Sequence, residues 1–166
     1  MINSNLKTLI ERYLTQNYID PFAMAQDDII CCSCKTLRLA PLEVSELKTL
    51  ILKLNDGFSI ALQKLIDLKG ISDVECYKKA GVSKQTWFKI INEKNYKPSK
   101  NTVIAFSIAL ELSYEETQAL LSTVGFTLSK SSKFDVIIEY FIKHKIYDVF
   151  LINEALFAFD LTCLTV

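Results

Sequence analysis

The sequence predicts an all-α protein. Its 166 residues include only four glycines and three prolines, and half of them are apolar. The apolar residues recur mostly at spacings of three and four rather than alternating, which is the period of amphipathic helices. Serines stand ahead of several of these apolar runs, as helix N-caps do. This length suits one domain with an extension, or two very small units.

The first 57 residues are expected to form a helical arm with an irregular loop. Apolar residues at helical spacing predict a first amphipathic helix around residues 6–14. Residues 18–42 hold two of the three prolines and are expected to form a long loop. A short helix over Ser45 to Lys53 should follow, ending at the "NDG" of Asn55 to Gly57.

A domain of five consecutive helices is expected over residues 58–125. Ser72 and Glu75 have the spacing of a capping box, and Gly81 can end the second helix in the left-handed conformation. Ser83, Ser99 and Ser113 are expected to cap the next three helices. The predicted helices cover residues 58–68, 72–80, 83–92, 99–110 and 113–125.

Two further helices are expected in a C-terminal extension, residues 126–166. Ser131 or Ser132 should cap a helix through about His144, and a last helix should cover Asp148 to Phe159. Apolar residues crowd both segments, and one buried stripe per helix cannot absorb them all. We therefore expect residues 133–145 and 148–160 to contribute to a homodimer interface. The alternative is that they only complete the core of the monomer.

The segment "DVECYKKAGVSKQTWFKIINEKNYKPSKNTVIAFSIALELSYEE" (residues 73–116) resembles the Xre, or lambda-repressor-like, helix-turn-helix family. The residues that carry the resemblance are the Gly81–Val82–Ser83 turn, Gln85–Thr86, inward-facing Trp87 and Ile90, Lys97–Pro98–Ser99, and residues 109–116. It covers residues 58–124. It implies a five-helix DNA-binding core whose recognition helix, Lys84 to Asn92, enters the major groove, and a role in transcriptional regulation. The tail also resembles an extension that follows such domains in some bacterial proteins.

One position departs from the family. The fifth position of the two-helix motif is usually alanine, because the helices touch there, and here it is Tyr77. A phenol ring between closely packed helices widens their angle. Either the recognition helix is tilted, or Tyr77 points outward, and both alternatives bear on DNA docking more than on the fold.

Candidate DNA contacts follow from the face of the recognition helix opposite Trp87 and Ile90. The predicted DNA-binding residues are Ser83, Lys84, Gln85, Phe88, Lys89, Lys94, Lys97 and Lys100. Gln85 is suited to adenine edges, and the lysines to guanine or phosphate. Phe88 is suited to a thymine methyl, but partial burial in the packing is the preferred interpretation of this residue.

Charge is distributed unevenly along the chain, although the total is zero. Residues 73–100 hold seven lysines and three acids, a net charge of +4, and residues 101–166 hold four lysines and eight acids, a net charge of −4. One segment can thus attract phosphates while the tail repels them. The alternative is an ordinary solvated lysine face.

Other classes of function find little support in the sequence. The five cysteines include the clustered Cys31, Cys32 and Cys34, and one C-x-x-C pair with a single histidine falls short of a zinc site. Phosphate-binding glycine motifs and a catalytic dyad are both missing, so we expect neither an enzyme nor a cofactor. With no apolar run long enough for a membrane span, we expect a cytoplasmic protein. The main alternative to DNA binding is a protein-interaction or adaptor module that kept the fold; RNA binding is a third.

Overall fold

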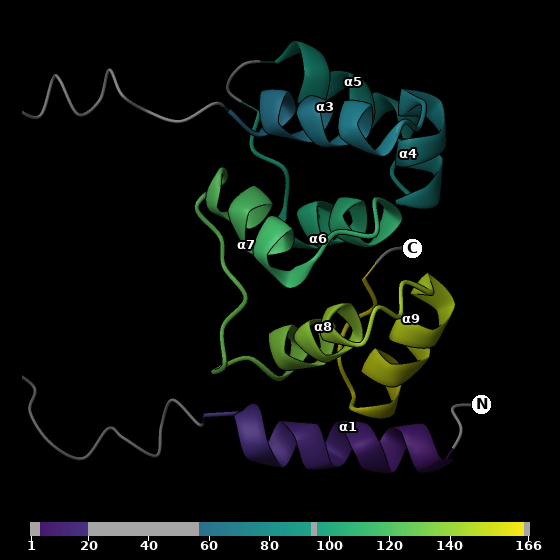
Figure 1. The fold of residues 1–166 in the computed structure, drawn as a ribbon, viewed down its shortest axis with the longest axis vertical. Coiled ribbons are helices and arrows are strands. Elements are labelled where there is room, and N and C mark those ends of the chain that lie inside the picture. Colours follow the sequence, from purple (N-terminus) through teal and green to yellow (C-terminus); the bar gives the residue numbers. More distant parts are fainter. Residues whose placement is uncertain (1–3, 20–56, 94–95, 165–166) are drawn as a thin grey trace, which may run out of the picture. The chain divides into compact units, whose positions relative to one another are not determined.

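The computed structural model describes residues 4–19, 57–93 and 96–164, and all regular secondary structure in these residues is helical (Figure 1). The all-α prediction is therefore confirmed for this part of the chain. The helices are α1 (Ser4–Asn17), α3 (Phe58–Lys69), α4 (Asp73–Lys79), α5 (Lys84–Asn92), α6 (Lys100–Ala109), α7 (Tyr114–Ser122), α8 (Lys133–Lys143) and α9 (Val149–Ala158).

The helices begin directly after the serines that the sequence predicts as N-caps. Ser72, Ser83, Ser99, Ser113 and Ser132 each accept a hydrogen bond from the backbone N–H three residues later. The capping box predicted at Ser72 is wrong for one of its two hydrogen bonds. The Glu75 carboxylate does not accept from the Ser72 N–H but lies 3.5 Å from the Lys79 ammonium. The complete capping box is formed by Ser113 and Glu116, which exchange both hydrogen bonds.

The turn between α4 and α5 is fixed by the backbone of Gly81. Its φ is +64°, a left-handed conformation that costs glycine little. Gly81 N–H donates to the Lys78 carbonyl at 3.0 Å and Val82 N–H to the Tyr77 carbonyl at 2.9 Å, the pattern of a Schellman motif. The predicted end of this helix is confirmed.

Helices α3 to α7 share one core, and the inner face of α5 contributes to the aromatic residues at its centre. The Trp87 ring lies 5.8 Å from Phe106 of α6, which in turn lies 6.3 Å from Phe58 of α3. Trp87 and Ile90 are both buried, as predicted. Packing therefore fixes which face of α5 is free for contacts.

The extension is joined to this core through α8. Helix α8 contacts α1, α7 and α9 (Figure 1), and each residue from Asp135 to Ile142 is buried. The Lys100 ammonium of α6 lies 2.6 Å from Asp135, and Tyr13 of α1 donates a hydrogen bond to Glu139 at 3.3 Å. Helix α8 is thus part of the monomer's own core. This was the alternative to a role in a homodimer interface. On α9, Phe150 and Phe157 remain exposed.

Several expectations fall outside the described residues. These are most of the loop over residues 18–42, the helix from Ser45 to Lys53, the cysteine cluster and Lys94. Within the described residues, no helix is long and apolar enough to cross a membrane.

Candidate functional site

Helix α5 presents a polar face because its opposite face is held in the core. Ser83 caps it, accepting from Thr86 N–H at 3.1 Å, and the two hydroxyls lie 3.0 Å apart. Lys84, Gln85 and Lys89 are exposed. The structure therefore brings these predicted contact residues together on one helix, next to the α4–α5 turn.

Phe88 belongs to the exposed face. Its side chain is 60% exposed, so the preferred interpretation as a partly buried packing residue is wrong. Residues three and four apart share a helix face, which places Phe88 with Lys84, Gln85 and Asn92 rather than with Trp87. Asn92 donates its side-chain N–H to the Phe88 carbonyl at 2.9 Å. An exposed phenyl group among polar side chains is available to a binding partner.

Tyr77 lies against the core rather than in solvent. Its ring centroid is 5.9 Å from that of Trp87, with the ring planes inclined by 34°. The alternative that Tyr77 points outward is therefore wrong. The neighbouring Cys76 and Ala80 are fully buried and provide the small side chains on the inner face of α4.

The predicted phosphate-binding lysines divide into two groups. Lys84, Lys89 and Lys97 are exposed. Lys100 instead directs its ammonium to Asp135, whose carboxylate is 2% exposed and also accepts from Ser129 N–H at 2.9 Å. Lys100 is thus committed to joining α6 to α8.

A groove of about 260 Å³ lies beside the turn, and the sequence analysis missed it. It is lined by Gly81, Val82, Ser83, Thr86, Ser99, Asn101, Thr102 and Leu164. The signal was a repeated S-K-x-T pattern, "SKQT" at residues 83–86 and "SKNT" at residues 99–102. In both copies the serine caps a helix and its hydroxyl meets the threonine hydroxyl, at 3.0 and 2.9 Å. Helix N-termini with hydroxyl groups favour negatively charged groups.

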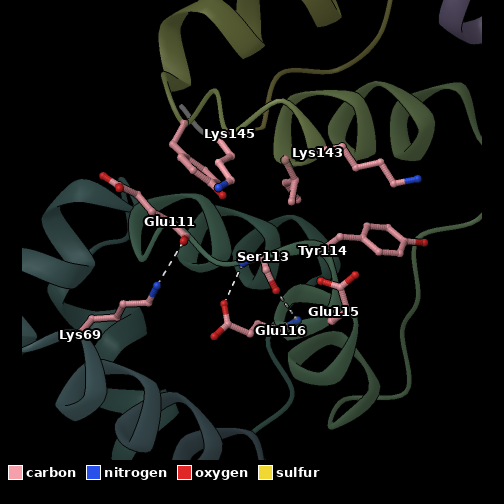
Figure 2. Close-up of a pocket in the computed structure, with 10 residues that line it drawn as sticks. Lys69, Glu111, Ser113, Tyr114, Glu115, Glu116, Lys143 and Lys145 are labelled. Atoms are coloured by element: carbon pink, nitrogen blue, oxygen red, sulfur yellow. Dashed lines mark hydrogen bonds between the residues drawn. The ribbon is translucent and has the colours of Figure 1, made fainter.

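A larger groove, of about 490 Å³, lies where α3, α7 and α8 meet (Figure 2). Its ten lining residues include three lysines and three glutamates, so their charges balance. Figure 2 shows the Lys69 ammonium donating to the Glu111 carbonyl, at 3.3 Å, and the reciprocal bonds of Ser113 and Glu116. Tyr147 donates to the Leu112 carbonyl at 3.0 Å, and burial, with smaller contributions from Glu111 and Glu116, raises its pKa. Of these bonds, the one from Tyr147 joins the extension to the core, whereas the others lie within the α3–α7 core.

The described part of the chain holds no metal-binding group, and of its two cysteines Cys163 is exposed and Cys76 is buried. No group of three or more histidine, cysteine, aspartate or glutamate side chains there is placed to hold a metal ion. Cys76 is fully buried, and burial, followed by Asp73 and Glu75, raises its pKa to about 12. A thiol of this kind is a small apolar core residue rather than a nucleophile.

Comparisons of the chain with family models, curated proteins and solved structures found no match.

Proposed function

We propose that this protein is a sequence-specific DNA-binding regulator of transcription that uses α4 and α5 as a lambda-repressor-like helix-turn-helix within the α3–α7 core. The observation that carries the proposal is the face of α5. Lys84, Gln85 and Phe88 are exposed together, while Trp87 and Ile90 hold the opposite face in the core. A helix whose inner face is packed in the core and whose exposed face is polar is suited to reading base edges in the major groove.

Each exposed group has a chemical role in this proposal. Gln85 pairs with an adenine edge, and the Phe88 ring contacts a thymine methyl. Lys84, Lys89 and Lys97 contact phosphates and set the register. The serine and threonine hydroxyls at the N-termini of α5 and α6 donate further, uncharged hydrogen bonds to the DNA backbone. Lys100 is left out of the proposed DNA contacts, because its ammonium is paired with Asp135 within the protein.

Duplex affinity should depend steeply on salt. Each lysine that neutralises a phosphate releases a counterion and contributes about −0.9 to the slope of log K against log salt. Lys97→Ala should therefore weaken binding to all duplexes alike and reduce the slope by about one per protomer. The measurement is fluorescence anisotropy of a labelled mixed-sequence duplex over a salt series. Lys145→Ala is the matched control, because it removes the same charge from an exposed site between α8 and α9. Binding that does not change with salt would contradict the proposal.

Sequence preference should depend on Gln85 in a different way. Gln85→Ala should relax the preference at one base pair by about 1–3 kcal/mol and leave the salt slope unchanged. Selection from random duplex DNA with the wild type defines the site, and competition with single-base variants of that site measures the change. Gln63→Ala, an exposed glutamine on α3, is the control and should leave every preference unchanged. A uniform loss across all sequences with Gln85→Ala would contradict a base contact.

A homodimer is part of the proposal, since two-fold symmetry gives two recognition helices the spacing of a palindromic site. One further observation favours the adaptor alternative. Phe150 and Phe157 are 86% and 77% exposed and are seven residues apart on α9, so they share a face that suits a protein partner. Failure of the wild type to bind any duplex at low salt would favour that alternative over DNA binding.

A further inference from the structure

Phe88 is the only large apolar residue of α5 that is exposed, and the structure describes the whole of this helix. Its side chain is 60% exposed, whereas Trp87 and Ile90 are 7% and 3% exposed on the opposite face. The neighbours of Phe88 on the exposed face include Gln85 and Asn92, three residues before it and four after it. The ring therefore lies in solvent, among polar side chains, until a binding partner covers it.

The ring itself offers no hydrogen bond to a partner. A phenyl group carries neither a donor nor an acceptor, and one of its polar neighbours is directed elsewhere. The side-chain N–H of Asn92 donates to the Phe88 carbonyl at 2.9 Å, back toward its own helix. At this position α5 thus presents an apolar surface to whatever it contacts.

Only one group in the major groove suits such a surface. The edges of the base pairs present ring nitrogens, carbonyl oxygens and amino groups, and the C5-methyl group of thymine is the apolar exception. A phenyl ring placed on a polar edge displaces water and returns no hydrogen bond, which costs free energy. Phe88 therefore favours a pyrimidine that carries a methyl group at C5.

Thymine is not the only base with this group. 5-Methylcytosine carries a methyl group at the same ring carbon and differs from thymine in its exocyclic group, which is an amino donor in place of the carbonyl acceptor. A side chain without donors or acceptors forms a conventional hydrogen bond with neither. The ring thus responds to the presence of the methyl group rather than to the identity of the pyrimidine.

We infer that Phe88 recognises the C5-methyl group itself, so that the ligand of α5 is DNA with a C5-methylated pyrimidine, either thymine or 5-methylcytosine, at the position facing this ring. The inference rests on the proposed function, which assigns the ring to a thymine methyl, and extends it to the methylation state of the DNA. A site with cytosine at this position is bound more tightly when that cytosine is methylated.

Four duplexes that differ at one base pair test the inference. Selection from random DNA defines the site, and replacing each thymine in turn with deoxyuridine locates the methyl group that binding requires. That pair is then made thymine–adenine, uracil–adenine, 5-methylcytosine–guanine or cytosine–guanine. In both kinds of pair, loss of the methyl group should raise the Kd by about fourfold per half-site, the worth of one buried CH₂ group. Fluorescence anisotropy measures each Kd.

Variants of Phe88 assign the effect to the ring. With Phe88→Ala, the methylated and unmethylated duplexes of each pair should bind equally, because the apolar surface is gone. Phe88→Leu keeps an apolar side chain and should keep most of the preference. Leu68→Ala is the matched control, since it removes an apolar side chain that is 81% exposed on α3, and it should leave both ratios as in the wild type.

The outcomes distinguish this inference from the proposed function. If the wild type selects a site but deoxyuridine is tolerated at every thymine, methyl recognition is overturned and DNA binding stands. The same holds if Phe88→Ala keeps the preference, or if the cytosine and 5-methylcytosine duplexes bind the wild type equally. If the wild type binds no duplex at low salt, the proposed function fails and methyl recognition fails with it.

Discussion

Replacing Trp87 with alanine should lower the free energy of unfolding by about 3–5 kcal/mol, the cost of removing a large aromatic side chain from a well-packed core. The Trp87 side chain is 7% exposed, and its ring lies within 6 Å of both Tyr77 and Phe106. The cavity left by the indole would therefore be bordered by aromatic rings from α4 and α6. Urea denaturation followed by far-ultraviolet circular dichroism measures the effect, since the variant lacks the tryptophan needed for fluorescence.

Phe88→Ala is the matched control for Trp87→Ala. The two residues are adjacent on α5 and both aromatic, but Phe88 points to solvent. Its removal should change the free energy of unfolding by no more than about 0.5 kcal/mol, as for other exposed positions. Equal destabilisation by the two substitutions would contradict the orientation of α5, and with it the choice of residues proposed to face DNA.

The helix starts could be predicted from the sequence because their determinants are local. A serine cap such as Ser83 needs only the N–H three residues later, and Gly81 needs only its own conformational freedom. Helix ends without glycine left no such signal. Glu111, Lys145 and Asp160 all adopt a positive φ, of +50°, +56° and +54°, in positions where no residue type marked the stop. Each of these turns is closed by the same two backbone hydrogen bonds as the turn at Gly81, although its residue lacks the conformational freedom of glycine.

The candidate site could be predicted only in part, for a similar reason. Periodicity identified the inner face of α5 through Trp87 and Ile90, and so its outer face. Periodicity also places Phe88 on that outer face, but the general tendency of phenylalanine to be buried outweighed this signal. The ion pair of Lys100 could not be predicted from the sequence, because its partner, Asp135, is 35 residues away along the chain. The same holds for Leu164, which reaches the turn only through the path of the extension.

The pair between Lys100 and Asp135 carries the second large prediction. Asp135→Ala should destabilise the protein by about 3 kcal/mol, toward the lower end of the range for breaking a buried ion pair. The loss leaves the Lys100 ammonium and the Ser129 N–H without their acceptor. The value lies at the lower end because the Lys100 side chain is 27% exposed and keeps part of its hydration.

A double-mutant cycle isolates the interaction from the other losses. Lys100→Met should also destabilise, because it leaves the Asp135 carboxylate buried without a cation. With Asp135→Leu as the second single variant, the double variant Lys100→Met with Asp135→Leu should be more stable than either single variant, since two apolar side chains can replace a buried ion pair at little cost. Additive losses in the double variant would show that the pair contributes no coupling between α6 and α8.

The same Lys100→Met variant tests the division of the lysines. If Lys100 acts inside the protein, this substitution should alter stability and leave the salt slope of DNA binding as in the wild type. A slope reduced by about one per protomer, as expected for Lys97→Ala, would instead place Lys100 on a phosphate. The two lysines are only three residues apart, so this contrast decides how far the DNA-facing surface extends from α5 toward the extension.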